Sequence, residues 1–218
     1  MAQPLPSTVG VLGGTFDPVH HAHLRIARLA LDVLGLGLVL WMPTGAPGYR
    51  AAPLASAEDR VAMLRLALAG EPRYAIDTLE LESGATGYTV DTLEVLRARY
   101  GEPLPLVLLI GGDQFAKLDT WHRWRDLFRL AHIAVFARPG WAPPEGEAGI
   151  ELRARRAASH GDWRRRPAGA IILVDMAPID ISATALRRAI AQGEATDDWL
   201  PSEVLRHIFT HRLYRGGN

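Results

Sequence analysis

The chain has 218 residues, 48% of them hydrophobic, and its 24 basic residues balance its 24 acidic residues. This length and composition are enough for a continuous core in one large domain. The zero net charge argues against nucleic acid or an acidic membrane as the main partner, so we expect a small-molecule partner. Because the chain contains no cysteine, disulfides, thiolate metal sites and thiol catalysis are excluded.

The N-terminus lacks the basic region and long apolar run of a secretory signal. The most apolar segment, residues 29–42, contains Asp32 and two glycines and is too short to span a bilayer. We therefore expect the protein to remain in the cytoplasm.

The chain is predicted to begin with a strand, a glycine turn and a helix. Val9, Val11 and Leu12 indicate a short buried strand, and the helix is indicated by apolar residues at helical spacing, Leu24, Ala27, Leu31 and Leu34. His20 and His23 lie three residues apart at the helix start, so their rings project from one side. A helix N-terminus after a glycine turn offers N–H groups and a partial positive charge to an anion, which predicts a phosphate site.

Two other interpretations of this stretch are weaker. It lacks the glycine spacing of a dinucleotide fingerprint and the lysine of a P-loop. His20, His21 and His23 could instead be zinc ligands, but no cysteine or carboxylate cluster accompanies them in the sequence.

The rest of the chain alternates between apolar strand patterns and helical patterns. Strands are predicted at residues 38–42, 106–110, 133–136 and 171–174. Ser56 with Asp59 predicts a capped helix start, and Thr89 the cap of another helix. Residues 79–82 alternate like an edge strand, and residues 141–149 are typical of a loop. This order predicts an α/β fold, a Rossmann-like doubly wound parallel sheet with helices on both faces, in a single domain over residues 1–218.

Two further helices are predicted near the C-terminus. Ser182 fits the N-cap of the first, with Ile181 and Leu186 placed for a hydrophobic staple. Gly193 fits its left-handed C-cap. The last helix is predicted to start at Pro201 and to carry Val204, Leu205 and Ile208.

Several motifs resemble one family. GGTFDPVHHAH at residues 13–23 resembles the first signature of the nucleotidyltransferase superfamily, and ISATALRR at residues 181–188 resembles the second. GYTVDTL, LIGGDQF, DTWHRW and ARPG, between residues 87 and 140, are similar to segments of bacterial nicotinate-nucleotide adenylyltransferases. The resemblance extends over nearly the whole chain.

This resemblance implies adenylyl transfer from ATP to nicotinate mononucleotide, giving deamido-NAD and pyrophosphate in NAD biosynthesis. It implies catalytic roles for His20, His23 and Arg187, Mg²⁺ bound mainly through the ATP phosphates, and no metal ligands from the protein. The implied ATP-binding residues are Gly13, Gly14, Thr15, Phe16, His20, His23, Gly111, Asp113, Ser182, Thr184 and Arg187. The implied acceptor-binding residues are Arg50, Tyr88, Thr89, Trp121 and Arg138.

Each motif also has a purely structural interpretation. Ser182 could be only a helix cap, Asp113 likewise, and we expect Trp124 to pack in the core. DTWHRW mixes basic and aromatic residues as RNA-binding surfaces do, but it is short.

The alternative activities for the chain are pantetheine-phosphate or nicotinamide-mononucleotide adenylyltransferase, or a nucleotide-binding regulator without catalysis.

The sequence departs from the family pattern at two places. Ala22 replaces the usual glycine between the histidines, which alters the backbone approach there. Gly48 and Tyr49 replace the usual proline and histidine, while Arg50 is kept.

Overall fold

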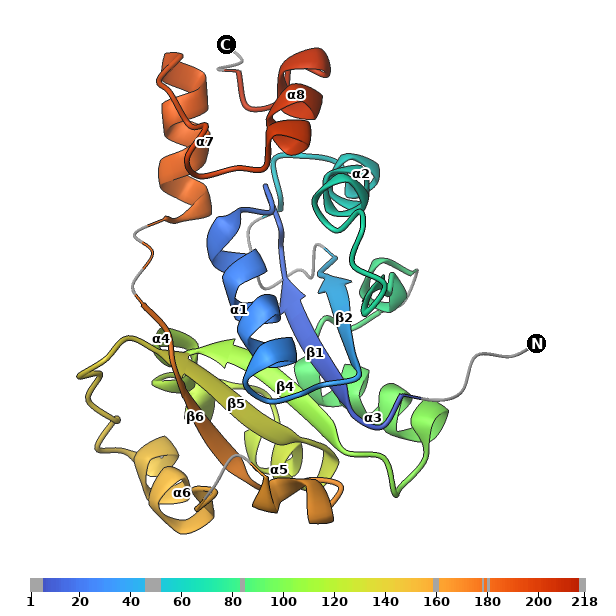
Figure 1. The fold of residues 1–218 in the computed structure, drawn as a ribbon, viewed down its shortest axis with the longest axis vertical. Helices are drawn as coiled ribbons and strands as arrows, with labels where there is room; N and C mark the ends of the chain where they lie inside the picture. The colour runs from blue at the N-terminus through green and yellow to red at the C-terminus, as the bar shows by residue number, and fades with distance from the viewer. Residues whose placement is uncertain are drawn as a thin grey trace.

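Six parallel strands form one sheet in the order β3-β2-β1-β4-β5-β6 (Figure 1). The computed structural model describes residues 6–45, 52–82, 85–158, 161–177, 179 and 181–215. The strands are β1 (Val9–Gly14), β2 (Leu38–Pro43), β3 (Tyr74–Ile76), β4 (Leu106–Gly111), β5 (His132–Ala137) and β6 (Ile171–Asp175). The strand order reverses between β1 and β4, the point where open α/β sheets bind ligands at the carboxyl ends of their strands.

Helices cover both faces of the sheet (Figure 1), which confirms the predicted fold class. Alternate strand residues point to opposite faces, so Val11 belongs to one hydrophobic cluster and Leu12 to the other. The cluster that contains Leu12 is covered by α1 (His21–Asp32), α2 (Ala57–Ala67), α7 (Ala183–Gln192) and α8 (Ser202–Thr210). The other is covered by α3 (Thr89–Tyr100), α4 (Gly112–Phe115), α5 (Leu127–Leu130) and α6 (Glu147–Arg155).

Short 3₁₀ helices complete the secondary structure. They are η1 (Leu79–Leu81), η2 (Leu118–Thr120), η3 (Trp124–Asp126) and η4 (Asp162–Arg165). Trp124 is 7% exposed and packs in the core, as predicted. Within the described ranges, no helix is long and apolar enough to cross a membrane.

The predicted caps of α2 and α7 are confirmed. Ser56 caps α2, since its Oγ accepts the Asp59 N–H at 3.0 Å. Ser182 caps α7, accepting the Ala185 N–H at 3.2 Å. Gly193 ends α7 at φ 72°, in the left-handed region that glycine adopts without steric cost.

The predicted edge strand at residues 79–82 is wrong. The Asp77 carboxylate accepts the Leu79 N–H at 3.0 Å, and the Leu81 N–H bonds to the Thr78 carbonyl at 2.8 Å. These local bonds wind the segment into η1, as aspartate does in turns. The edge strand is β3 instead, which pairs with β2.

Two predicted helix starts are also corrected. Thr89 is the first residue of α3 and Tyr88 is its N-cap, with an extended backbone. Pro201 is the N-cap of α8 rather than its first residue.

The loop predicted at residues 141–149 ends at Gly146, where α6 begins. Gly149 lies within α6, and a Cβ on it would lie 1.7 Å from the Pro144 carbonyl oxygen. This glycine therefore serves close packing rather than a loop.

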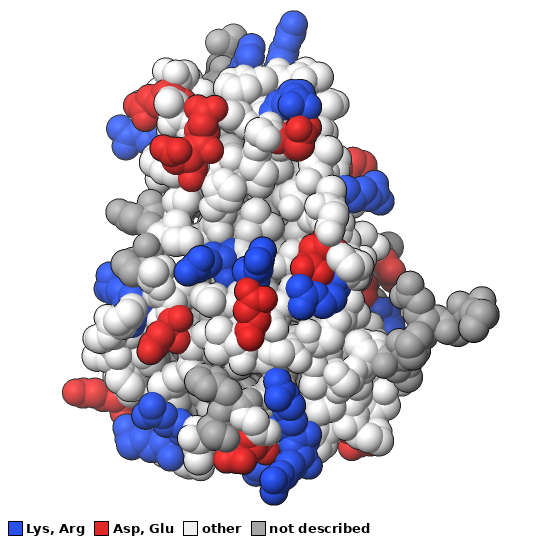
Figure 2. All heavy atoms as spheres, in the orientation of Figure 1, with Lys and Arg blue, Asp and Glu red and all other residues white. Residues whose placement is uncertain are grey.

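Charged groups of both signs are interspersed over the face shown in Figure 2. No single sign dominates this face, in keeping with the zero formal net charge. Such a surface does not produce the extended positive field that attracts nucleic acid.

Candidate active site

The turn after β1 is held together by the carboxylate of Asp17, which is 3% exposed. One of its oxygens accepts the Leu54 N–H at 2.8 Å, and the other accepts the Ala55 N–H at 3.0 Å and the Tyr214 hydroxyl at 2.7 Å. These donors come from the segment before α2 and the segment after α8. The turn is therefore fixed from two distant parts of the chain.

Asp17 also joins the two sequence motifs. The Arg187 guanidinium donates to the Asp17 backbone carbonyl at 2.7 Å and lies 3.7 Å from its carboxylate. The start of α7 is thus held against the glycine turn at the end of β1. The folded chain thus brings the first and second signatures into contact through Arg187 and Asp17.

A buried arginine also holds the same turn in place. Arg60 of α2 is 2% exposed and donates to the carbonyls of Thr15 and Thr44, at 2.7 and 2.8 Å. Both carbonyls come at or just after strand ends. The guanidinium of Arg60 therefore holds together the segments that follow β1 and β2.

His20 and His23 lie against each other at the start of α1. Their rings stack with centroids 3.8 Å apart, and His23 also contacts the edge of Phe16. The backbone N–H of His20 donates to Nδ1 of His23 at 3.3 Å. Since Nδ1 of His23 accepts, a neutral His23 carries its proton on Nε2, where it can be donated to an anion.

Both imidazoles are neutral at pH 7. Burial, with a smaller contribution from His21, lowers the pKa of His20 to about 4, and burial with repulsion from His20 lowers the pKa of His23. Nδ1 of His20 is buried without a hydrogen-bond partner among the described residues. A bound polyanion would supply the negative charge that favours protonation of these rings.

The predicted phosphate-contacting groups surround the carboxyl ends of β1 and β4. Among the described residues, no atom lies within 4 Å of a Cβ built on Gly13 or on Gly111, so these residues leave open space beside both strand ends. Asp113 lies in α4, directly after β4, and is exposed. Phe16, in contrast, is 1% exposed and packs in the core, and its backbone has φ 49° within the turn.

At the start of α7, Ser182 and Thr184 are both exposed. Arg187 donates to the Thr184 hydroxyl at 3.3 Å as well as to Asp17. Ser182 is both a helix cap and an exposed hydroxyl, so the structural and functional interpretations of this residue are compatible.

The predicted acceptor-binding residues gather at the start of α3. Tyr88 stacks on His122 with ring centroids 4.3 Å apart, and Trp121, which precedes His122, packs with Tyr88 against the same hydrophobic cluster. Thr89 begins α3 beside them. The structure thus brings together Tyr88, Thr89 and Trp121.

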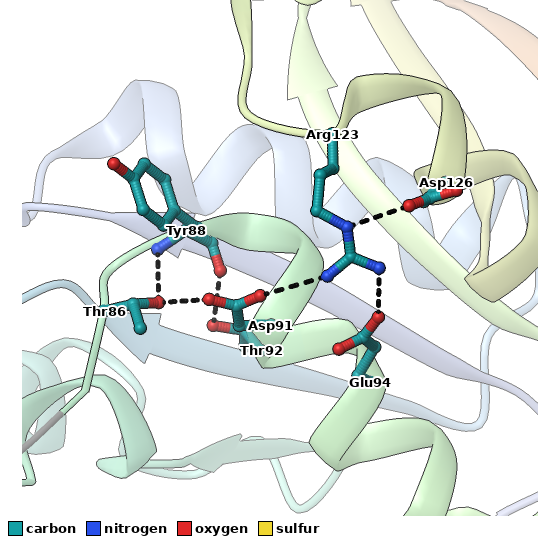
Figure 3. Close-up of polar contacts among 7 residues, drawn as sticks. All are labelled: Thr86, Tyr88, Asp91, Thr92, Glu94, Arg123 and Asp126. Carbon is teal, nitrogen blue, oxygen red and sulfur yellow. Dashed lines mark hydrogen bonds and ion pairs between the residues drawn. The ribbon is translucent and has the colours of Figure 1, made fainter.

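A charged network holds these two segments in register (Figure 3). Arg123 pairs with Glu94 at 2.7 Å, with Asp126 at 2.9 Å and with Asp91 at 3.6 Å. Asp91 in turn accepts the Thr86 hydroxyl at 2.6 Å, and the Thr86 Oγ accepts the Tyr88 N–H at 3.1 Å. Arg123 has φ 49°, an uncommon conformation for a non-glycine residue, and three carboxylates surround its guanidinium.

Another predicted acceptor residue, Arg138, is exposed and directly follows β5. Arg50, with Gly48 and Tyr49, lies outside the described residues. Ala22 is the second residue of α1, and alanine has a higher helix propensity than the usual glycine.

The sequence interpretation gave no functional role to Asp17, Arg60 or Tyr214. The aspartate lies within the first signature, but its partners are distant in sequence, with Tyr214 separated from it by 197 positions. No local pattern indicates such contacts.

The sheet order, the open strand ends and the paired motifs define a nucleotide-binding α/β protein of the nucleotidyltransferase type. A model of the family described as cytidylyltransferase-like matches residues 11–189. The chain is 49% identical over 211 residues to a protein of Laribacter hongkongensis, with 95% of this chain and 94% of that one covered. It is 46% identical to a protein of Dechloromonas aromatica, covering 99% of both. Both are named "Probable nicotinate-nucleotide adenylyltransferase".

The chain belongs to the cytidylyltransferase-like family and, within it, to the nicotinate-nucleotide adenylyltransferases. Two solved structures of Plasmodium falciparum nicotinic acid mononucleotide adenylyltransferase share the fold, one complexed with APC and one with NaAD. Each has a TM-score of 0.71 at 14% identity and covers 95% of this chain, with 96% and 97% of the other chain covered.

Proposed function

We propose that this chain transfers the adenylyl group of ATP to nicotinate mononucleotide, giving deamido-NAD and pyrophosphate, and that it acts in the cytoplasm. One observation carries the proposal. The Arg187–Asp17 contact holds the second signature against the first, so groups suited to a triphosphate converge at the switch point of the sheet. The names of relatives that match nearly the whole chain support the same activity.

In this reaction an oxygen of the acceptor 5′-phosphate attacks the α-phosphorus of ATP. The new P–O bond forms as the bond to the bridging oxygen of the β-phosphate breaks, and pyrophosphate leaves with that electron pair. Catalysis of this kind depends on positioning the reactants and stabilising charge rather than on a covalent enzyme intermediate.

The described residues supply these two functions. Nε2–H of His23 would donate to an α-phosphoryl oxygen, with His20 beside it, and Arg187 would stabilise charge on the departing pyrophosphate. Ser182 and Thr184, at the start of α7, would hydrogen-bond the β- and γ-phosphates. Gly13 and Gly111 would let ATP approach the ends of β1 and β4 closely. Asp113 would hydrogen-bond the ribose.

Mg²⁺ would enter with ATP, held by phosphate oxygens and water, and would neutralise part of the phosphate charge. The carboxylate of the turn itself, Asp17, already accepts three hydrogen bonds. Because these bonds already occupy both oxygens of the carboxylate, we expect the substrate phosphates rather than Asp17 to bind the metal ion.

The acceptor would bind between the start of α3 and the Trp121 segment. Tyr88 and Trp121 can stack on a pyridine ring, while Thr89 can donate to its carboxylate. Arg50 and Arg138 remain proposed acceptor contacts.

The deciding experiment measures pyrophosphate release from Mg-ATP with nicotinate mononucleotide, nicotinamide mononucleotide and phosphopantetheine in parallel. We expect the nicotinate compound to be the preferred acceptor. Equal rates with the three compounds, or no release with any, would contradict the proposal. A preference for either other acceptor would assign the chain to the corresponding alternative activity.

A further inference from the structure

A second group of chemically reactive side chains lies where α2 packs against α8. It consists of Asp59 in the first turn of α2, His207 in α8 and His211, the C-cap of α8. Nε2 of His207 lies 3.1 Å from a carboxylate oxygen of Asp59, and the two imidazoles stack with centroids 4.0 Å apart. One ligand atom from each of the three residues lies within 4.8 Å of the others.

Two of the ligand atoms, Nε2 of His207 and one oxygen of Asp59, are hydrogen-bonded to each other, and the bond made by His211 leaves its other ring nitrogen available. Nδ1 of His211 lies 3.0 Å from the His207 carbonyl oxygen, which can only accept, so Nδ1 carries the proton and the Nε2 lone pair is available. The second oxygen of Asp59 accepts the Ser56 hydroxyl at 2.9 Å. Metal-bound histidines and carboxylates are oriented by the same kinds of outer partner.

We propose that Asp59, His207 and His211 form a binding site for a divalent transition-metal ion, with Zn²⁺ as the fitting ion and water as the fourth ligand. Two imidazoles and one carboxylate are a common zinc ligand set, whereas Mg²⁺ and Ca²⁺ favour oxygen donors. A tetrahedral ion with bonds of about 2.0–2.2 Å needs ligand atoms roughly 3.3–3.5 Å apart. The ligand atoms now lie within 4.8 Å of one another, so the exposed His211 would move inward to reach this spacing.

A metal ion here would act as a clamp rather than as a catalyst. It would replace the proton between His207 and Asp59 and tie α8 to α2. Both helices lead to the glycine turn, because Ala55, just before α2, and Tyr214, after α8, both bond to Asp17. The ion would therefore stabilise the packing that positions the turn, outside the set of residues proposed to contact the substrates.

The test uses the full-length protein after treatment with a chelator. We expect it to bind one equivalent of Zn²⁺ by calorimetry, to give the visible absorption of tetrahedral Co²⁺, and to melt at a higher temperature with Zn²⁺. His211→Ala should weaken Zn²⁺ binding by about tenfold or more and remove the Co²⁺ bands. Because His211 is exposed, this variant should fold, which circular dichroism checks.

Two further variants make the result decisive. Asp59→Asn removes the charged ligand with little change of shape, so it should also weaken Zn²⁺ binding. His122→Ala removes an exposed imidazole from another part of the chain and should keep wild-type Zn²⁺ binding. The proposal is overturned if wild-type protein binds no Zn²⁺, or if its Co²⁺ spectrum is unchanged in His211→Ala and Asp59→Asn.

Discussion

Replacing Asp17 with asparagine tests whether its charge holds the two motifs together. The amide oxygen can keep the bonds from Ala55 and Tyr214. Its NH₂ group would then face the Leu54 N–H, so two donors would meet where a donor and an acceptor now pair. Arg187 would also lose the carboxylate 3.7 Å away, while keeping its bond to the Asp17 carbonyl.

The expected loss of stability follows from these contacts. A hydrogen bond to a charged group contributes about 1.5–3 kcal/mol. Two charges 3.7 Å apart attract by roughly 4.5 kcal/mol at an effective dielectric constant of ~20, but the cost of burying them offsets most of this. We expect a net loss of about 3 kcal/mol, which lowers the Tm of a chain this long by roughly 6–12 °C.

The assay is thermal and urea unfolding of Asp17→Asn beside Asp32→Asn. Asp32 forms an ion pair with Arg28 in which the side chains are 51% and 69% exposed, so the same chemical change there should cost at most about 0.5 kcal/mol. If the two variants have the same Tm, the carboxylate of Asp17 does not hold the turn and this reasoning is refuted.

Three further outcomes follow from the structure. His23→Ala should lower kcat for pyrophosphate release about tenfold or more without unfolding the chain, because it removes a donor to the developing charge. Burial lowers the pKa of His20 and of His132 to about 4, so the unfolded chain takes up protons more readily than the folded chain below pH 6.5. Urea unfolding should therefore show stability that is full above pH 6.5 and falls as the pH drops toward 4, by about 2 kcal/mol per histidine at pH 5. Gly149→Ala should lower the Tm by several degrees, because its Cβ would lie 1.7 Å from the Pro144 carbonyl oxygen.

Each of these outcomes can be contradicted by a specific result, and two of them have a control variant. Wild-type turnover in His23→Ala would defeat its proposed role. His132→Gln can replace the bonds to the Ala170 N–H and the Arg166 carbonyl and should show a shallower loss of stability toward acid; an unchanged slope would remove His132 from the explanation. Gly161→Ala, where a Cβ meets nothing within 4 Å, should melt close to the wild type. Equal melting of both glycine variants would contradict the steric argument.

The sheet could be predicted because its strands are buried on both faces and therefore appear as nearly continuous apolar runs. β3 has only three residues, all partly exposed, and offers no such run. Residues 79–82 have the alternation of a strand, but the bond from Leu79 to Asp77 outweighs that pattern.

Both signatures could be predicted because each is contiguous in the sequence. What joins them could not, since the Arg187–Asp17 contact spans 170 positions. The same limit hid the proposed metal site, where His207 and Asp59 are 148 positions apart. The sequence around Asp59 indicates only its part in a helix cap.

The hydrogen bond from Tyr214 to Asp17 also affects the order in which the protein can be made. A ribosome makes Asp17 197 positions before its partner Tyr214, which follows α8. Contacts so distant in sequence form late, because a long loop must close first. A nascent chain can thus pair its strands before the bond from Tyr214 stabilises the glycine turn. A tag or fusion placed just after Tyr214 would therefore affect the turn as directly as a substitution beside it.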